Sequence, residues 1–320
     1  MDNNKVNIWL DCDVGNDDAM AVILSLFHPR SNLLGISTCF GNTSLENCTD
    51  NTIRLLSSVG RTDVPVYKGA EFSLKSTRAT TKMHGSQGLY AADRLISSFK
   101  PLQNIELYDL IKQTAKDQEF VIVITGPQTN IAKLLKDHEN IIPQIQQIVF
   151  MGGTSGFGNV TPNSEYNIYS DPEAAQFVID ICRQHSLKLV MISLDLTYTC
   201  QLLEPLQQRI KNINSKFSDW CLEMLQEYQA AYKAQEFEYP PIHDPVAVFY
   251  ALHPELYVIK PVYCAVECDS KLCYGRTVVD KQDVYGFEPT LLFARKVIVD
   301  EFWNQMIEAI KVAAKNSKIE

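Results

Sequence analysis

Four aspartates lie within eight residues near the start of the chain: Asp11, Asp13, Asp17 and Asp18. A helix N-terminus favours carboxylates, which accounts for one or two of them but not for four in one place. Crowded carboxylates repel one another unless they share a proton or bind a cation. Ligand sets made only of oxygen are typical of Ca²⁺ and Mg²⁺ sites. The spacing therefore favours a metal site over a helix cap.

Apolar segments on either side must position these aspartates. Residues 6–10 predict a buried strand, and residues 19–27 predict an apolar helix. Alternate side chains of a strand share a face, so Asp11 and Asp13 are expected to project together at the carboxyl end of the strand. Gly15 permits the tight turn that leads into the helix.

The rest of the chain repeats this alternation of short apolar strands with helices. Further strands are predicted over residues 33–40, 64–67, 120–124, 147–151 and 187–194. The pattern is typical of an α/β fold with a mainly parallel central sheet flanked by helices, which is Rossmann-like. Strands at 257–266, 276–280 and 291–299 suggest a small antiparallel addition near the C-terminus. Because no linker or repeat interrupts the sequence, one domain over residues 1–320 is expected.

Polar residues follow the predicted strands, where α/β sheets bind their ligands. They are Asp11, Asp13, Asn42, Thr125, Thr129, residues 159–167 and Asp195. Stretch 159–167 is rich in amides and acids that suit a sugar, but it also fits a surface loop rich in turns. The pair His243-Asp244 is either a helix start or a proton donor beside a further oxygen ligand.

The composition and charge of the chain limit the kinds of molecule that it is expected to bind. The formal net charge of −9 argues against nucleic acid or an acidic membrane surface and favours a neutral or cationic small molecule. No apolar run reaches the roughly 18 residues of a membrane helix, and no signal peptide is recognised. Nine cysteines scattered through apolar segments suit reduced thiols, so a cytoplasmic location is expected.

Several motifs resemble those of the inosine-uridine preferring nucleoside hydrolases. The aspartate cluster is similar to the D-x-D-x-G-x-D-D hallmark of that family, with Val14 where the family usually has proline. The likeness continues in family order through Cys39-Phe40-Gly41-Asn42, Thr125-Gly126-Pro127-Gln128-Thr129-Asn130, Met151-Gly152-Gly153, Asn159-Val160-Thr161-Pro162, Glu165-Tyr166-Asn167, Asp171-Pro172-Glu173 and His243-Asp244-Pro245.

The resemblance implies the nucleoside hydrolase fold and calcium-dependent hydrolysis of the N-glycosidic bond of ribonucleosides to ribose and free base. The ligands of Ca²⁺ would be Asp13, Asp18, Asp244 and the backbone carbonyl of Thr129. The ribose would be held by Asp17, Asn42, Asn159, Glu165 and Asn167, with Met151 beneath the sugar. Asp13 would also be the general base for the attacking water, and Asp11 a supporting acid.

The leaving base needs a proton or hydrogen bonds. His243 is the candidate acid, and His84 and Tyr239 are candidate contacts of the base. The His-Asp pair resembles family members that accept pyrimidines, which favours uridine while leaving inosine and other nucleosides open. The family resemblance also implies a homodimer or homotetramer.

Two other interpretations of the sequence compete with that of a hydrolase. A D-x-D strand end also occurs in haloacid-dehalogenase-type phosphatases, but that interpretation leaves the pair Asp17-Asp18 and the Asn-rich stretch unexplained. A non-catalytic protein that binds a nucleoside or calcium would lack a general base or a proton donor. Candidates for both are present in Asp13 and His243, which favours an enzyme.

Overall fold

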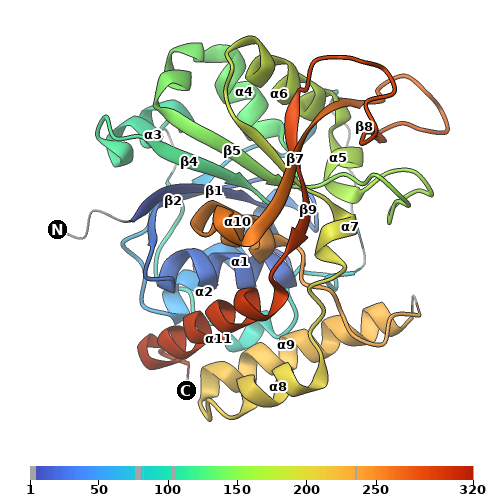
Figure 1. Cartoon of the computed structure of the whole chain (residues 1–320). Helices are drawn as coiled ribbons and strands as arrows, with labels where there is room; N and C mark the ends of the chain where they lie inside the picture. Colours follow the sequence, from blue (N-terminus) through green and yellow to red (C-terminus); the bar gives the residue numbers. More distant parts are fainter. Residues whose placement is uncertain (1–4, 76–80, 82, 103–104, 235, 320) are drawn as a thin grey trace.

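Nine strands form a single sheet in the computed structural model, which describes residues 5–75, 81, 83–102, 105–234 and 236–319 (Figure 1). Their order across the sheet is β3-β2-β1-β4-β5-β6-β9-β7-β8. The strands are β1 (Val6–Cys12), β2 (Ser31–Thr38), β3 (Val66–Lys68), β4 (Phe120–Ile124), β5 (Ile145–Met151), β6 (Leu189–Ile192), β7 (Tyr257–Val266), β8 (Thr277–Asp280) and β9 (Leu291–Val297).

The sheet is parallel from β3 to β9 and antiparallel only at its last two pairings, β9 with β7 and β7 with β8. This confirms a mainly parallel sheet with an antiparallel part near the C-terminus. This antiparallel part belongs to the main sheet and is not a separate addition, because β9 pairs in parallel with β6 at Val190 and Met191.

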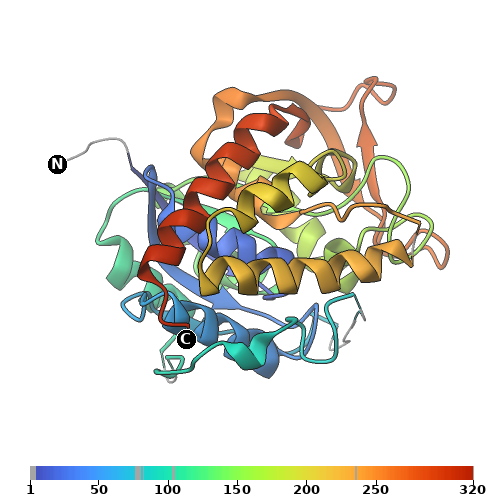
Figure 2. The ribbon, with the colours of Figure 1, turned by 90° about the horizontal axis from the view of Figure 1, so that it is seen from below.

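Helices cover both faces of the sheet and form two hydrophobic cores (Figures 1 and 2). One face carries α1 (Asn16–Phe27), α2 (Leu45–Ser58), α9 (Lys216–Lys233), α10 (Asp244–Leu252) and α11 (Val299–Asn316). The other carries α3 (Leu107–Ala115), α4 (Thr129–Asp137) and α6 (Pro172–Gln184). Three shorter helices are α5 (Tyr166–Ser170), α7 (Leu194–Thr197) and α8 (Glu204–Lys211).

Strand β1 explains why the sequence predicted this arrangement. Ile8 and Leu10 point into one core and Trp9 into the other, and all three are fully buried. A strand covered on both faces is apolar at successive positions, which is the pattern of a parallel sheet between helices.

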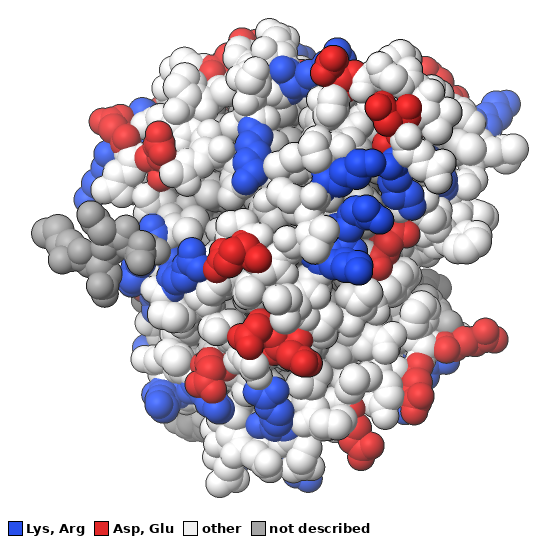
Figure 3. All heavy atoms as spheres, viewed as in Figure 1, with Lys and Arg blue, Asp and Glu red and all other residues white. Residues whose placement is uncertain are grey.

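Among the described residues, no helix is both long and apolar enough to cross a membrane. Acidic and basic side chains are interspersed over the face seen in Figure 3.

Two element boundaries differ from expectation near the carboxyl ends of the strands. Helix α1 begins at Asn16, three residues before the apolar run, so Asp17 and Asp18 lie in its first turn. The Asp18 carboxylate accepts a hydrogen bond from the backbone N–H of Gly15 at 2.9 Å, which lets polar residues form this turn. Strand β6 ends at Ile192, so Asp195 lies inside α7 rather than at a strand end.

Helices α1 and α10 pack against each other and are joined again at their C-terminal ends. His28 caps α1 and His253 caps α10, with 3.2 Å between their Nε2 atoms. The backbone N–H of Arg30 donates to His28 Nδ1, so the neutral His28 ring carries its proton on Nε2, which faces His253. Burial, aided by His253 and Arg30, lowers the pKa of His28 to about 4.

The low pKa of His28 predicts that this pairing weakens in acid. Between the ordinary pKa of 6.5 and the folded value of about 4, the unfolded chain binds a proton at His28 that the folded chain does not. This histidine therefore contributes stability above pH 6.5 that is lost as the pH falls towards 4. Urea unfolding across this range should show a shallower loss of stability in His28→Gln than in the wild type. His185→Gln, at a partly exposed position, is the control; an unchanged slope in His28→Gln would contradict the prediction.

Candidate active site

The N-terminal aspartates are all buried but do not all face the same way. Asp11 is bonded to other elements: its Oδ1 accepts hydrogen bonds from the Ser37 hydroxyl and from the Asn130 amide, the latter at 2.8 Å, while its buried Oδ2 has no partner. Burial raises its pKa to about 7. Asp11 therefore ties β1 to β2 and α4.

Asp13 and Asp18 are held by donors from neighbouring strand ends. Asp13 Oδ2 accepts the backbone N–H of Asn42 at 2.7 Å, while its buried Oδ1 has no hydrogen-bond partner. Asp18 accepts the Thr125 hydroxyl at 2.7 Å and the Asn42 side-chain amide at 3.0 Å. Burial and the neighbouring carboxylates raise the pKa of Asp13, and burial raises that of Asp18.

Asp17, Asp18 and Asp244 converge, with one carboxylate oxygen of each within 4.8 Å of the other two. Asp17 and Asp18 come from the first turn of α1 and Asp244 from the first residue of α10, so two helix N-termini face the cluster. Burial and the other aspartates raise the pKa of Asp244 and raise that of Asp17 to about 7. Such a set of buried oxygens, together with the unpartnered oxygen of Asp13, fits a hard divalent cation.

Thr129, from which a carbonyl ligand was expected, is not among the residues that line the cavity described next. Its hydroxyl donates to Asp171 at 2.6 Å, at the start of α4. Thr125, four residues earlier, is the first residue beyond β4 and lines the cavity described next. The motif Thr-Gly-Pro-Gln-Thr contains a threonine at each end, and only the position where the strand stops distinguishes them.

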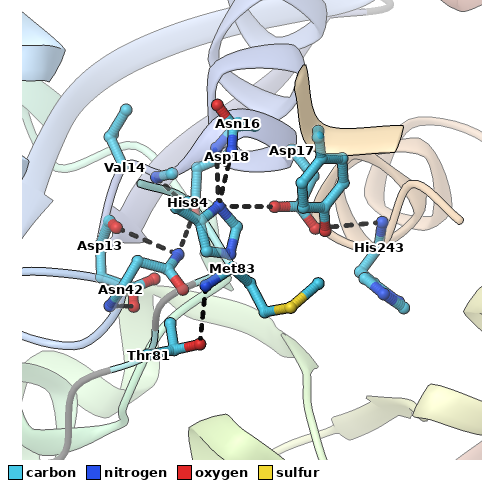
Figure 4. A network of polar contacts seen from close by, with 12 residues as sticks. Asp13, Val14, Asn16, Asp17, Asp18, Asn42, Thr81, Met83, His84 and His243 are labelled. Atoms are coloured by element: carbon cyan, nitrogen blue, oxygen red, sulfur yellow. Dashed lines mark hydrogen bonds and ion pairs between the residues drawn. The ribbon is translucent and has the colours of Figure 1, made fainter. Parts of the chain in front are cut away.

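A cavity of about 370 Å³ opens beside the carboxylates, and Figure 4 shows the polar contacts at one side of it. Its lining residues are Asp17, Asn42, Thr81, Met83, His84, Thr125, Met151, Asn159, Val160, Glu165, Tyr166, Asn167, Tyr198, Tyr228, Tyr232, His243 and Asp244. Every predicted contact of ribose or base is in this set except Tyr239. That residue lines a separate surface depression with Glu204 and Gln207, so the structure does not support a contact of Tyr239 with the base.

Glu165 and Asn167 are fixed by the backbone around the ends of β4 and β5. Glu165 accepts the N–H of Gly153 at 2.8 Å, and the Asn167 amide donates to the carbonyls of Thr125 at 2.8 Å and Met151 at 3.2 Å. These bonds hold an acid and an amide rigidly in the cavity wall. Their oxygens remain able to accept further hydrogen bonds from a polyhydroxylated ligand.

His243 lies within a chain of hydroxyl groups and bonds to one on each side. Its Nε2 lies 2.8 Å from the Tyr232 hydroxyl, which accepts the Tyr228 hydroxyl at 3.4 Å, and its Nδ1 lies 2.6 Å from the Thr197 hydroxyl. Burial lowers the pKa of His243 to about 3, so the ring is neutral near pH 7. Neither tyrosine was among the contacts predicted from the sequence. Their spacing of four residues, which puts them on one face of α9, was the available signal.

His84 lies over the other side of the cavity (Figure 4). Its Nδ1 accepts the backbone N–H of Asn16 at 3.0 Å, so the proton of the neutral ring is on Nε2. Burial and His243 lower the pKa of His84 to about 3. The ring lies 5.3 Å from that of Tyr228, centroid to centroid. His84 follows a polar stretch of the sequence, of which residues 76–80 and 82 lie outside the described residues.

The sequence matches the inosine-uridine preferring nucleoside hydrolases over residues 8–304. The chain belongs to this family. It is 36% identical over 287 residues to the pyrimidine-specific ribonucleoside hydrolase RihA of Escherichia coli O1:K1, covering 88% of this chain and 91% of that protein. It is 35% identical over 288 residues to RihA of Shewanella sp. (strain MR-7), covering 88% and 89%. Among solved structures, the purine-preferring ribonucleoside hydrolase from Gardnerella vaginalis superimposes with a TM-score of 0.87 at 29% identity, covering 97% of this chain and 99% of that one.

The hydrolase places glycine where its backbone passes Asp13. A Cβ added to Gly41 would overlap Asp13 Oδ2, so Gly41→Ala must displace this carboxylate or the Asn42 N–H that holds it. A shift of about 1 Å at reacting groups costs on the order of 100-fold in rate. We expect kcat for ribose release to fall by at least about that factor. Gly286→Ala, also at a positive φ (+62°) but with nothing within 4 Å of the added carbon, is the control for backbone strain without displacement of a neighbour. Wild-type turnover in Gly41→Ala would show that the position of Asp13 is not critical.

Proposed function

We propose that this ribonucleoside hydrolase is calcium-dependent and that the ion is held by Asp13, Asp18, Asp244 and the backbone carbonyl of Thr125. The observation that carries the proposal is the convergence of the buried carboxylates of Asp17, Asp18 and Asp244, two of which line the cavity. The buried Oδ1 of Asp13, which has no hydrogen-bond partner, adds a further oxygen. No lysine or arginine is among the described residues that line this cavity, so a bound cation is needed to offset the acids. Thr125 replaces Thr129 of the sequence-based ligand set because it borders the cavity.

When bound, the ion supplies positive charge that acidifies the attacking water. Asp13 is suited to take the proton of that water. Its Oδ2 is occupied by the Asn42 N–H, which fixes the carboxylate and leaves the unpartnered Oδ1 to act as general base.

The remaining polar residues of the cavity bind the sugar. N-ribosyl cleavage passes through a state with positive charge on the ring, as glycoside hydrolysis does. Asp17 and Glu165 place negative charge beside the ring and accept its hydroxyls, and Met151 lies beneath it. The amides that complete the sugar site are Asn42, Asn159 and Asn167.

The leaving base is stabilised through the chain of hydroxyls rather than by His243 alone. The Thr197 hydroxyl also donates to the Leu194 carbonyl at 3.2 Å, so it accepts from His243 Nδ1, and Nε2 accepts from Tyr232. If all of these hydrogen bonds reverse, His243 Nε2 donates to Tyr232 and Tyr232 donates to Tyr228. The Tyr228 hydroxyl then donates towards the cavity instead of accepting from it. The similarity to pyrimidine-specific relatives supports uridine as the favoured substrate. Hydroxyls that can both donate and accept leave inosine and other nucleosides accessible.

The first experiment measures free ribose released from uridine, cytidine, inosine and adenosine, with and without a calcium chelator. We expect release that the chelator abolishes and that added Ca²⁺ restores, with uridine fastest. Asp13→Asn should keep the fold and reduce kcat by several orders of magnitude because the general base is lost. Release that is insensitive to the chelator would refute the calcium requirement. No release from any nucleoside would favour a non-catalytic nucleoside-binding protein.

The hydroxyl chain predicts a dependence on the leaving group. Tyr232→Phe removes the hydroxyl between His243 and Tyr228 while keeping the ring. It should lower kcat for uridine by about 100-fold, the scale of general acid catalysis, and hardly change p-nitrophenyl riboside, whose leaving group needs no proton. Tyr198→Phe, another tyrosine of the cavity, is the matched control. Equal losses on both substrates would assign Tyr232 a purely structural role.

We also propose that the protein is a homodimer or homotetramer that acts in the cytoplasm. The family resemblance supports the first, and the nine free cysteines support the second. Light scattering on the purified protein tests the oligomeric state. Family membership leaves no reason to retain the phosphatase alternative, and Asp11, which a D-x-D mechanism would need in the cavity, is bonded to Ser37 and Asn130 instead.

A further inference from the structure

The loop 154–164 between β5 and α5 forms one wall of the cavity but has little hydrophobic anchoring of its own. Asn159 and Val160 line the cavity. Phe157, the one aromatic side chain of the loop, is 87% exposed. An exposed glycine-containing loop loses much conformational entropy when it is ordered, so other contacts must hold it in place.

The segment 272–277, which leads into β8, supplies those contacts. At the start of the loop, the Thr154 N–H donates to the Thr277 hydroxyl at 2.8 Å, and that hydroxyl donates to the Thr154 carbonyl at 2.6 Å. At its end, the Ser164 hydroxyl donates to the Tyr274 carbonyl at 2.6 Å. Both ends of the loop are thus fixed to the antiparallel part of the sheet.

Arg276 joins the two limbs of the loop between these ends. Its Nη1 donates to the carbonyl of Gly156 at 3.1 Å and to the carbonyl of Asn163 at 3.3 Å. One guanidinium nitrogen therefore bridges backbone positions on either side of Asn159. Hydrogen bonds from a charged donor are stronger than those between neutral groups. Asp195 is a second charged contact, but it accepts only from the start of the loop, at Thr154 and Ser155, whereas Arg276 joins its two limbs.

We propose that Arg276 is a positioning residue for the sugar: it holds the loop 154–164 so that Asn159 and Val160 close the wall of the cavity. The proposal rests on the proposed function, because it assigns this wall to the ribose. Arg276 itself is not among the residues that line the cavity, so it acts only through the loop. The antiparallel addition to the sheet then serves substrate binding, although it contributes no lining residue.

The test compares Arg276→Met and Arg276→Lys with the wild type and with Arg295→Met, an exposed arginine on β9. We measure kcat and KM for uridine, the Kd of D-ribose by calorimetry, and hydrogen exchange of the amides of residues 154–164. In Arg276→Met we expect KM and the ribose Kd to rise about tenfold with kcat within about threefold, because binding is lost without loss of the reacting groups. Exchange should accelerate in the loop and stay unchanged in β4 and β5.

Arg276→Lys should recover part of the affinity, because one ammonium can still reach a carbonyl of the loop, and Arg295→Met should match the wild type. Faster exchange of the loop with unchanged KM and ribose Kd would overturn the proposal. So would a parallel fall of kcat and thermal stability, which indicates a general structural role. A wild type that binds ribose but hydrolyses no nucleoside would refute the proposed function, and the ribose Kd of the variants would still decide the role of Arg276.

Discussion

The electrostatic cost of grouping four carboxyl groups in a place with little water is the constraint on which this structure depends. Removing a charge from water costs several kcal/mol even after the protein relaxes, and like charges add to that cost. The fold offsets part of it with the N-termini of α1 and α10 and with donors from Asn42 and Thr125. The remainder calls for a cation. These donors belong to elements that meet only where the parallel strands end.

The same constraint explains which residues were predictable. The sequence predicts the central strands β1, β4 and β5, because strands buried between two helical layers are apolar at successive positions. The carboxylate cluster could be predicted because most of its aspartates are close together in the sequence. The parallel pairing of β9 with β6 could not be predicted from the sequence, because the order of strands depends on which sheet edges remain free once the central strands are paired. The start of α1 was placed late because Asn16, Asp17 and Asp18 are polar, although they form its first turn.

Residues that reach the cavity from a distance were the hardest to assign. Tyr239 is close in sequence to His243 but lines a different surface depression, whereas Tyr232, on the preceding helix, hydrogen-bonds to that histidine. Proximity along the chain is a poor guide where a loop separates two helices. A spacing of four along α9 would have been the better guide. Thr125 and Thr129 differ in the same way, because one residue lies at the end of the strand and the other inside the helix.

The cavity unites residues that are far apart along the chain: the backbone N–H of His243 donates to Asp17, 226 positions away, at 3.3 Å. An unfolded or half-folded chain therefore has no comparable ligand set. A cation that binds only the complete fold stabilises it by mass action, in proportion to the logarithm of its concentration relative to Kd. The concentration of free metal thus contributes to the folded fraction of the whole molecule. Loss of the ion would lower the free energy of global unfolding, and so weaken regions that never touch it.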